Sequence, residues 1–581
     1  EPKVPYENVE GIQVKAEKIV RQKIRTPDFT PGIKRTETGM HLCVEAPGTF
    51  CHLAIYETGK KQGVRIPFSP EERVGDLWMM ELAGDDFSGL EYTIETEQGE
   101  LPDPCGRIYT GHERWGDLKA ALRPVRCRFP EETYDWEMDQ PLKHPYDETI
   151  LYRLHVRGFT RHTSSGTGER GTFRALTEKI PYLKELGITA VELMMPNEFQ
   201  EVMMEDGADG NPYATGTPTG RLNYWGYGAG YLFAPKASYT SGKEKEPERE
   251  FKDLVKEFHK NDIEVLVELY FTGEESAALA QEAVRFWVYE YHVDGVHLSG
   301  FAPAELLASD PLLADTKLLA GSWDSVRVPK TAAAPKLRER RRPPWSAGWH
   351  LGEYNEGFLI DMRRVLKGDE DQVGRLIYQT RRNPDAYGVI NYMAATNGFT
   401  MMDMVSCEQK HNEANGENNR DGSDYNYTWN CGVEGTTRKK KIVQMRKKQL
   451  RNAFLLLFLS QGTPMFLAGD EFGNSQNGNN NAYCQDNEIS WLNWHQLETN
   501  RDIYEFVKYM IAFRKAHPVF HLPVEPKNID YLVCGHPDVS YHGVKTWCPE
   551  FENFRRQFGI LYWGAYAKRP DGSDDANFYV A

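Results

Sequence analysis

Between Ile150 and Leu467 the chain alternates between short apolar runs and segments with helical periodicity, and this alternation restricts the fold more than any other feature. Apolar runs lie at 150–156, 189–195, 264–271, 293–298, 317–320, 389–393 and 464–467. Helical segments are predicted at 173–186, 251–259, 282–292, 440–461 and 501–516. Strands that are apolar on both faces and alternate with helices indicate a parallel sheet covered by helices. Seven or eight such units favour a closed (β/α)8 TIM barrel with long insertions over an open sheet.

The regions on either side of the barrel have a different pattern. Residues 1–145 show short alternating segments, such as 41–45 and 52–57, separated by Gly, Pro and Asp, which predict a β-sandwich. Residues 518–581 return to short strands, for example at 558–563 and 578–580. We therefore predict a sandwich over 1–145, a barrel over 146–517 and the beginning of a truncated C-terminal β domain over 518–581.

Composition excludes several classes of partner. The formal net charge of −16 argues against a nucleic-acid partner, which requires a basic face. No apolar run reaches the roughly 18 residues of a membrane-spanning helix. The nine cysteines form no CxxC motif, which predicts reduced thiols and a cytoplasmic protein rather than a disulfide framework or a zinc site. We expect no metal, no cofactor and no membrane partner.

Several long motifs in the barrel region have a recognisable order. They are Asn223-Tyr-Trp-Gly-Tyr227, Glu353-Tyr-Asn355 with 361–368, and the Asn-rich segments 411–422 and 476–491. In this order they resemble glycoside hydrolase family 13, in its isoamylase and glycogen-debranching branch. The front segment resembles a carbohydrate-binding module of family 48. The resemblance implies an α-glucan such as glycogen or starch as the ligand.

The positions where this family keeps its catalytic acids are changed. A retaining glycosidase needs two carboxyl groups about 5–5.5 Å apart, one as nucleophile and one as proton donor. The resemblance puts the nucleophile at Ser299, in Asp-Gly-Val-His-Leu-Ser, and the proton donor at Gly321. Asn397 stands where the family has a third, stabilising acid. The supporting positions differ as well, and hold Thr272, Gly273, His297 and Thr396.

These replacements predict that the family mechanism does not operate. A serine ether is a poor leaving group, and glycine offers no proton where general-acid help is typically worth about 10²–10⁴-fold in rate. Acids, bases and an arginine are replaced together, so we expect a mostly neutral barrel mouth without a pair of suitably spaced acids. Glu192 faces either the interior or the helices, and Glu268 and Asp294 brace the floor. Glu274, in a loop, is the best candidate for a relocated catalytic acid.

Residues that could still bind a glucan are aromatic or acidic. The candidates by resemblance are Tyr224, Trp225, Tyr227, Trp323, Asp470 and Glu471. Tyr224, Trp225 and Trp323 also fit a purely structural role as loop anchors. The leading prediction is a non-catalytic α-glucan-binding homologue, acting as a regulatory or scaffolding partner of an active debranching enzyme, because inactive subunits of this kind are known in the family.

Two alternatives remain open. One is an active α-1,6 or α-1,4 glucan hydrolase that uses relocated acids. The other is a structural or interaction protein built on an inactive barrel, as in amino-acid-transporter heavy chains, which need a membrane anchor that the sequence does not show.

Overall fold

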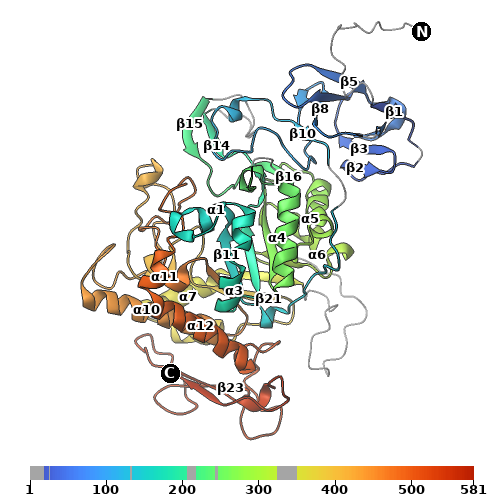
Figure 1. The fold of residues 1–581 in the computed structure, drawn as a ribbon. Helices are drawn as coiled ribbons and strands as arrows, with labels where there is room; N and C mark the ends of the chain where they lie inside the picture. The colour runs from blue at the N-terminus through green and yellow to red at the C-terminus, as the bar shows by residue number, and fades with distance from the viewer. Residues whose placement is uncertain are drawn as a thin grey trace, which may run out of the picture.

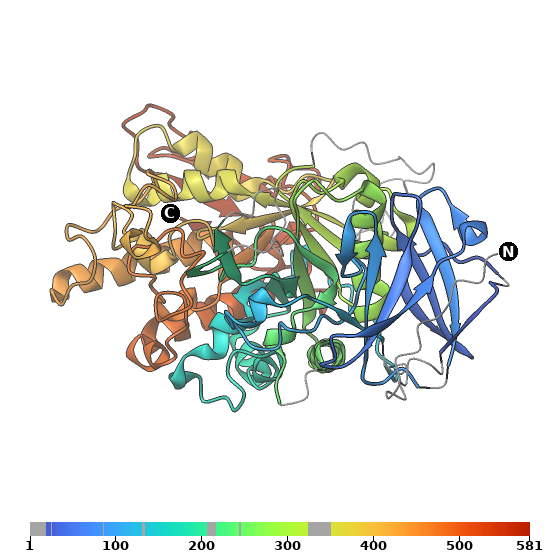
Figure 2. The same ribbon diagram turned by 90° about the horizontal axis from the view of Figure 1, so that it is seen from above.

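The computed structural model describes residues 19–24, 26–84, 86–130, 134–205, 217–242, 246–323 and 350–581. Figure 1 shows a β-sandwich and a small C-terminal sheet at opposite ends of the molecule, with a barrel between them. Seen from above in Figure 2, the sandwich lies to one side of the barrel, and the helices that follow the later barrel strands lie on the other.

The sandwich consists of two antiparallel sheets around an apolar core. One sheet has the order β1 (Val20–Gln22), β7 (Leu77–Ala83), β3 (Gly39–Glu45), β2 (Gly32–Thr36), with β6 (Arg73–Val74) beside β7. The other has the order β10 (Cys127–Arg128), β8 (Leu90–Thr96), β4 (His52–Glu57), β5 (Gly63–Pro67), with β9 (Gly99–Leu101) beside β8. Buried Leu53, Trp78 and Tyr92 belong to the core between the sheets. This arrangement confirms the sandwich.

Eight parallel strands close into a barrel. Their order is β11 (Leu151–His155), β12 (Ala190–Met194), β17 (Glu264–Phe271), β18 (Gly295–Gly300), β19 (Lys317–Ala320), β20 (Leu351–Asn355), β21 (Gly388–Tyr392) and β22 (Thr463–Leu467). Pairing of β22 with β11 closes the ring. The predicted (β/α)8 fold is therefore confirmed. The sequence pattern missed β20, because Gly352 and Glu353 interrupt its apolar run.

Helices surround the barrel. They are α1 (Val156–Arg161), α2 (Phe173–Thr177), α3 (Ile180–Leu186), α4 (Pro247–Lys260), α5 (Ala277–Tyr291), α6 (Ala304–Ala308), α7 (Glu356–Lys367), α8 (Val373–Arg381), α9 (Met401–Met404), α10 (Lys440–Leu459), α11 (His495–Thr499) and α12 (Arg501–Ala516). The single helix predicted over 173–186 is wrong. Pro181 in the first turn of α3 lacks an N–H and cannot continue a preceding helix, so two short helices form instead.

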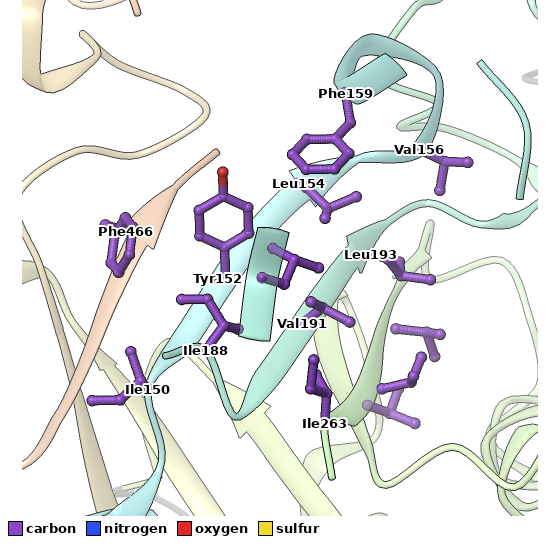
Figure 3. Close-up of a cluster of buried hydrophobic side chains, with 14 of the residues drawn as sticks. Ile150, Tyr152, Leu154, Val156, Phe159, Ile188, Val191, Leu193, Ile263 and Phe466 are labelled. Carbon is purple, nitrogen blue, oxygen red and sulfur yellow. The ribbon is translucent and has the colours of Figure 1, made fainter. Parts of the chain in front are cut away.

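The main core lies between the strands and this layer of helices. Figure 3 shows Tyr152, Leu154, Val191 and Leu193 of β11 and β12 among the side chains that pack there. A second, smaller cluster fills the barrel itself and contains Leu151, Ala190, Leu266, Leu319, Tyr354, Ile390, Tyr392 and Met465. Both faces of each strand are therefore buried, which accounts for the continuous apolar runs in the sequence.

Two short antiparallel strand pairs lie on the side of the barrel next to the sandwich. One pairs β13 (Asn197–Phe199) with β16 (Gly230–Pro235), and the other pairs β14 (Val202–Glu205) with β15 (Thr217–Leu222). The rings of Tyr109 and Tyr231 stack 3.6 Å apart, and Arg107 donates to Glu248 of α4 at 2.7 Å. Stacked rings and an ion pair thus join the sandwich to the barrel.

The C-terminal sheet has the order β23 (Val539–His542), β24 (Gly559–Tyr562), β25 (Phe578–Val580). It packs on the helices of the barrel, with the rings of Phe513 and Phe578 5.5 Å apart and Tyr562 Oη donating to Leu459 O at 3.0 Å. All nine cysteines are free thiols. In the described part of the chain, no helix has both the length and the apolar character needed to cross a membrane.

Candidate functional site

A polar layer lies inside the barrel, two residues beyond the apolar layer. Side chains two positions apart on a strand share a face, so the residues that follow Leu151, Ala190 and Leu266 on this face are Arg153, Glu192 and Glu268. Strand register places Arg153 beside Glu192 and Glu268 beside His297. Four neighbouring strands thus bring an arginine, two carboxylates and an imidazole together.

Arg153 is the hub of this layer. Its guanidinium bonds to Glu192 and donates to Glu268 Oε2 at 2.7 Å, to Tyr227 Oη at 3.1 Å and to Thr396 Oγ1 at 3.2 Å. Glu192 also accepts from His297 Nδ1 at 2.7 Å and from Tyr354 Oη. Glu268 also accepts from Tyr227 Oη at 3.0 Å and from Ser299 Oγ at 2.6 Å. The charged groups are therefore paired and bonded.

This cluster corrects one expectation. The interior is not mostly neutral, because Arg153 on β11 supplies a buried cation. Glu268 lies one layer below Ser299, since strand register pairs it with His297, but it still accepts a hydrogen bond from the Ser299 hydroxyl. Asp294 does lie at the amino end of β18, where it accepts from His259 Nε2 at 2.8 Å and Val265 N at 2.8 Å.

The electrostatics of the cluster favour its charged forms. Burial raises the pKa of Glu192, but the charges of Arg153 and His297 and their hydrogen bonds outweigh burial and lower it to about 2. Burial works against the charge of Arg153, but Glu268 and Glu192 outweigh it and raise the guanidinium pKa well above its ordinary value. Glu192 is thus ionised at neutral pH and holds no proton to donate.

The three catalytic positions of the family lie at the carboxyl ends of their strands. Ser299 is half-buried and bonded to Glu268, and His297 faces Glu192 rather than the Ser299 hydroxyl. Gly321 and Asn397 are exposed. Thr396 is half-buried and contacts Arg153. No carboxylate therefore stands at any of the three positions.

The loop after β17 carries Glu274, which the sequence suggested as a relocated catalytic acid. Glu274 is exposed, and its backbone N–H donates to Thr272 Oγ1 at 3.2 Å. The neighbouring Glu275 closes the loop by accepting from Thr272 Oγ1 at 2.9 Å and from Gly273 N at 3.0 Å. Glu274 thus lies in an exposed loop, whereas Glu268 accepts a hydrogen bond from Ser299.

Most of the predicted glucan-binding aromatics are buried. Tyr224 stacks on His155 at 4.1 Å, and Trp323 donates from Nε1 to Gly352 O at 2.8 Å. Together with Trp225 they are at most 5% exposed, which favours anchoring over sugar stacking. Tyr227 is half-buried and bonded to Glu268.

The two acidic candidates after β22 are also enclosed. Asp470 accepts from the backbone N–H of Met401 at 2.9 Å, and Glu471 accepts from the hydroxyls of Tyr152 and Tyr182. Both side chains are at most 1% exposed, so they brace the loop. We therefore do not propose them as glucan contacts. Burial raises the pKa of each to about 7.

This raised pKa makes a pH prediction for Glu471→Gln. In the wild type the folded-state pKa of Glu471, about 7, exceeds the ordinary value of 4.5, so its stabilising contribution is full below pH 4.5 and is lost as the pH rises through 7. The glutamine cannot ionise. We expect the free energy of unfolding of the variant, relative to wild type, to improve between pH 5 and pH 8, measured by urea unfolding at each pH. A difference that does not change with pH would contradict the assignment.

Phe301 is an exposed aromatic at the barrel mouth that the sequence did not single out. It follows β18 directly, is 76% exposed, and lies against the backbone of Gly273. No sequence pattern marks it, because it stands outside the family motifs and only the barrel brings it beside the loop after β17.

Gly321 has room for a side chain. An added Cβ meets no described atom within 4 Å, so we expect Gly321→Glu to change the free energy of unfolding by less than about 1 kcal/mol. Gly300 is the matched contrast, because its φ is +72° and an added Cβ would lie 2.1 Å from Phe271 O. Gly300→Ala should therefore cost more than about 1 kcal/mol in the same urea titration. Equal costs for the two variants would refute this account of the mouth.

Three clusters of potential metal ligands occur among the described residues. Two of them already contain a protein cation, Arg153 beside Glu192 and Glu268, and Lys236 beside Glu198 and Glu201. The third consists of Cys407, His411 and Glu434.

Comparison with known proteins identifies the family. No family model matches the chain. It is 30% identical to chloroplastic isoamylase 1 of Arabidopsis thaliana over 80% of this chain and 71% of the relative, and 31% identical to a glycogen debranching enzyme of Serratia proteamaculans over 79% of each. The chain belongs to the isoamylase and glycogen-debranching family. It spans only 58% of chloroplastic isoamylase 1 of Oryza sativa, to which it is also 30% identical.

Solved structures support the fold of this isoamylase relative. The catalytic module of the glycogen-degrading pneumococcal virulence factor SpuA superposes with a TM-score of 0.67, covering 96% of this chain and 89% of that one at 16% identity. A pullulanase mutant of Paenibacillus barengoltzii in complex with maltotetraose gives a TM-score of 0.65 over 96% of this chain and 88% of that one, at 17% identity.

Proposed function

We propose that this protein is a non-catalytic α-glucan-binding member of the isoamylase family and a partner of an active debranching enzyme. The observation that carries the proposal is the absence of a carboxylate at Ser299, Gly321 and Asn397, the positions of the family's acids. The relatives named as isoamylases and glycogen debranching enzymes support an α-glucan as the ligand. The nine free thiols support a cytoplasmic location.

The acids of the polar layer do not replace the missing ones. Glu192 is at 0% exposure and Glu268 at 1%, and one guanidinium binds both. A retaining mechanism needs one carboxyl group that holds a proton, and the lowered pKa of Glu192 removes that proton at neutral pH. The pair therefore serves to neutralise Arg153.

A second candidate function rests on the same pair. Ligand atoms of Glu192, Glu268 and His297 lie within 4.8 Å of one another, so two carboxylates do stand close together beneath Ser299. This arrangement favours an α-glucan hydrolase with relocated acids over the alternative of a purely structural protein. It requires Arg153 to leave Glu268 when a sugar enters.

Long incubation with glycogen and with pullulan, followed by a reducing-end assay, separates the two functions. Our proposal expects no release above a buffer blank. Release that Glu268→Gln abolishes would establish the hydrolase, and Glu274→Gln serves as the control for the exposed loop acid. Release from both variants would point to a contaminating enzyme.

Glucan binding is tested separately, by electrophoresis through gels that contain amylopectin or glycogen. We expect retardation of the wild type and weaker retardation of Phe301→Ala, because aromatic stacking contributes about 0.5–1.5 kcal/mol. Tyr509→Ala is the matched control, since Tyr509 is 62% exposed but lies on the outer helix α12. If neither glucan slows the migration of the wild type, the proposed binding function is wrong. Co-purification with an active debranching enzyme from the native host tests the partner.

A further inference from the structure

Three different metal-binding side chains converge in the segment between β21 and α10. Cys407, His411 and Glu434 each offer one ligand atom, and these atoms all lie within 4.8 Å of one another. A thiolate, an imidazole and a carboxylate are all ligands of Zn²⁺, which takes three protein ligands and a water where one position stays open. The three residues belong to neither the polar layer nor the family's catalytic positions.

Backbone contacts hold the three residues in place without an ion. Gly435 N donates to Ser406 O at 2.8 Å, which fixes the residue after Glu434 to the residue before Cys407. His411 N donates to Gly478 O at 2.8 Å. The ligand positions are therefore set by the fold, and an ion would not have to order this segment when it binds.

The carboxylate also has the outer partners that orient a metal ligand. Glu434 accepts from Glu408 N at 2.9 Å and from Asn430 Nδ2 at 3.0 Å, both through Oε2. Hydrogen bonds of this kind fix ligating carboxylates in metal sites. The other oxygen, Oε1, faces His411 and also accepts from Glu408 N and Gln409 N, each at 3.2 Å.

The distance between His411 and Glu434 is close to the one that two zinc ligands need. His411 Nε2 lies 3.0 Å from Glu434 Oε1. Zinc bonds of about 2.0–2.1 Å at the tetrahedral angle place two such atoms roughly 3.3 Å apart, so the pair has to widen by only a few tenths of an ångström. The side chains of His411 and Glu434 are 38% and 35% exposed, while Cys407 is buried behind them, which leaves a path for the ion from solvent.

Protein cations distinguish this cluster from the other two. Arg153 and Lys236 occupy those, whereas the ion-pair partner of Glu434 among the described residues is His411. Arg446 donates instead to backbone carbonyl oxygens, including those of Gly435 and Val433.

We propose that Cys407, His411 and Glu434 form a Zn²⁺ site with water as the fourth ligand. Binding replaces the hydrogen bond between His411 and Glu434 with two bonds to the metal. The imidazole proton moves from Nε2 to Nδ1, and the thiol proton of Cys407 is released to solvent. The ion would join three points of the long segment between β21 and α10. From the sequence alone we expect no metal, because the nine cysteines form no CxxC motif, whereas the three ligands proposed here are separated by 4 and 23 positions.

Zinc and cobalt titrations of the reduced, chelator-treated and tag-free full chain test the site. We expect one equivalent of Zn²⁺ by equilibrium dialysis, and a Co²⁺ complex with the charge-transfer absorption of a cobalt–thiolate bond. Cys407→Ser should abolish that absorption and weaken Zn²⁺ binding by more than the roughly 10–100-fold that loss of an outer partner costs. Cys431→Ser is the matched control, because Cys431 is also buried in this segment but lies outside the cluster.

His411→Gln provides a second variant that does not disturb a buried residue, and it should also lose the zinc equivalent. The proposal is overturned if the wild type binds no Zn²⁺, or if the cobalt–thiolate absorption persists in Cys407→Ser. It is equally overturned if Cys431→Ser loses the metal while Cys407→Ser retains it. None of these three results depends on whether the protein binds or cleaves a glucan.

Discussion

Arg153→Met is expected to lower the free energy of unfolding by about 3–5 kcal/mol at pH 7, because it leaves Glu192 and Glu268 buried without their shared cation. The methionine keeps much of the length of the side chain, so the loss reflects charge more than volume. Urea unfolding followed by near-ultraviolet circular dichroism measures it. Arg501→Met is the matched control, since Arg501 is 58% exposed in its pair with Glu505, and it should cost less than about 1 kcal/mol.

The cost of Arg153→Met should also depend on pH. In the wild type the folded-state pKa of Glu192, about 2, lies below the ordinary 4.5, so its stabilising contribution is present above pH 4.5 and is lost as the pH falls through 2. The variant lacks most of this contribution, and its deficit should shrink as the pH falls below 4.5. Adding Glu192→Gln and Glu268→Gln should recover part of the stability at pH 7. A deficit that is constant with pH and unrelieved by these changes would mean that packing, not charge, holds Arg153.

Lys236→Met is expected to have a similar cost, about 3–5 kcal/mol, at the side of the barrel next to the sandwich. Lys236 Nζ is fully buried and donates to Glu198 at 2.6 Å, Glu201 at 2.8 Å and Phe199 O at 2.7 Å. The variant leaves two carboxylates and a carbonyl in this place without a donor cation. Lys508→Met is the control, because Lys508 is 34% exposed and its pair with Glu185 should contribute less than about 1 kcal/mol.

A second substitution separates the charge of Lys236 from its role in packing. Lys236→Met with Glu201→Gln removes one of the two uncompensated charges and should be more stable than Lys236→Met alone. If the double variant is less stable than the single one, the two residues do not interact as an ion pair. His112, whose Nδ1 lies 3.0 Å from Glu198, is then the next partner of Glu198 to substitute.

The buried ion pairs of Arg153 and of Lys236 explain why several residues of the family motifs are buried. Asn223–Tyr227 lies between them, with Tyr227 bonded to Glu268 and Asn223 N donating to Glu201 O at 2.7 Å. A loop fixed at both ends keeps Tyr224 and Trp225 inside. Exposed Phe301 is therefore the better candidate for contact with a glucan chain.

The sequence by itself determined most of the barrel strands and the chemistry missing from the mouth. Periodicity distinguishes strands from helices locally, so seven of the eight barrel strands and the sandwich could be predicted, while β20 was missed because glycine and glutamate interrupt it. The identities of Ser299, Gly321 and Asn397 needed only a family motif. The reactive groups that these residues lack are absent in any conformation.

Only the tertiary structure decided which charges meet. A strand buried on both faces has no polar side to mark its orientation, so the sequence could not tell whether Glu192 faces the barrel interior or the helices. Closure of the barrel fixed that choice and placed Arg153 between Glu192 and Glu268, which are 39 and 115 positions away. Packing within the segment between β21 and α10 brought Cys407 beside Glu434. Interactions over such separations arise from strand register and loop packing, which no local pattern records.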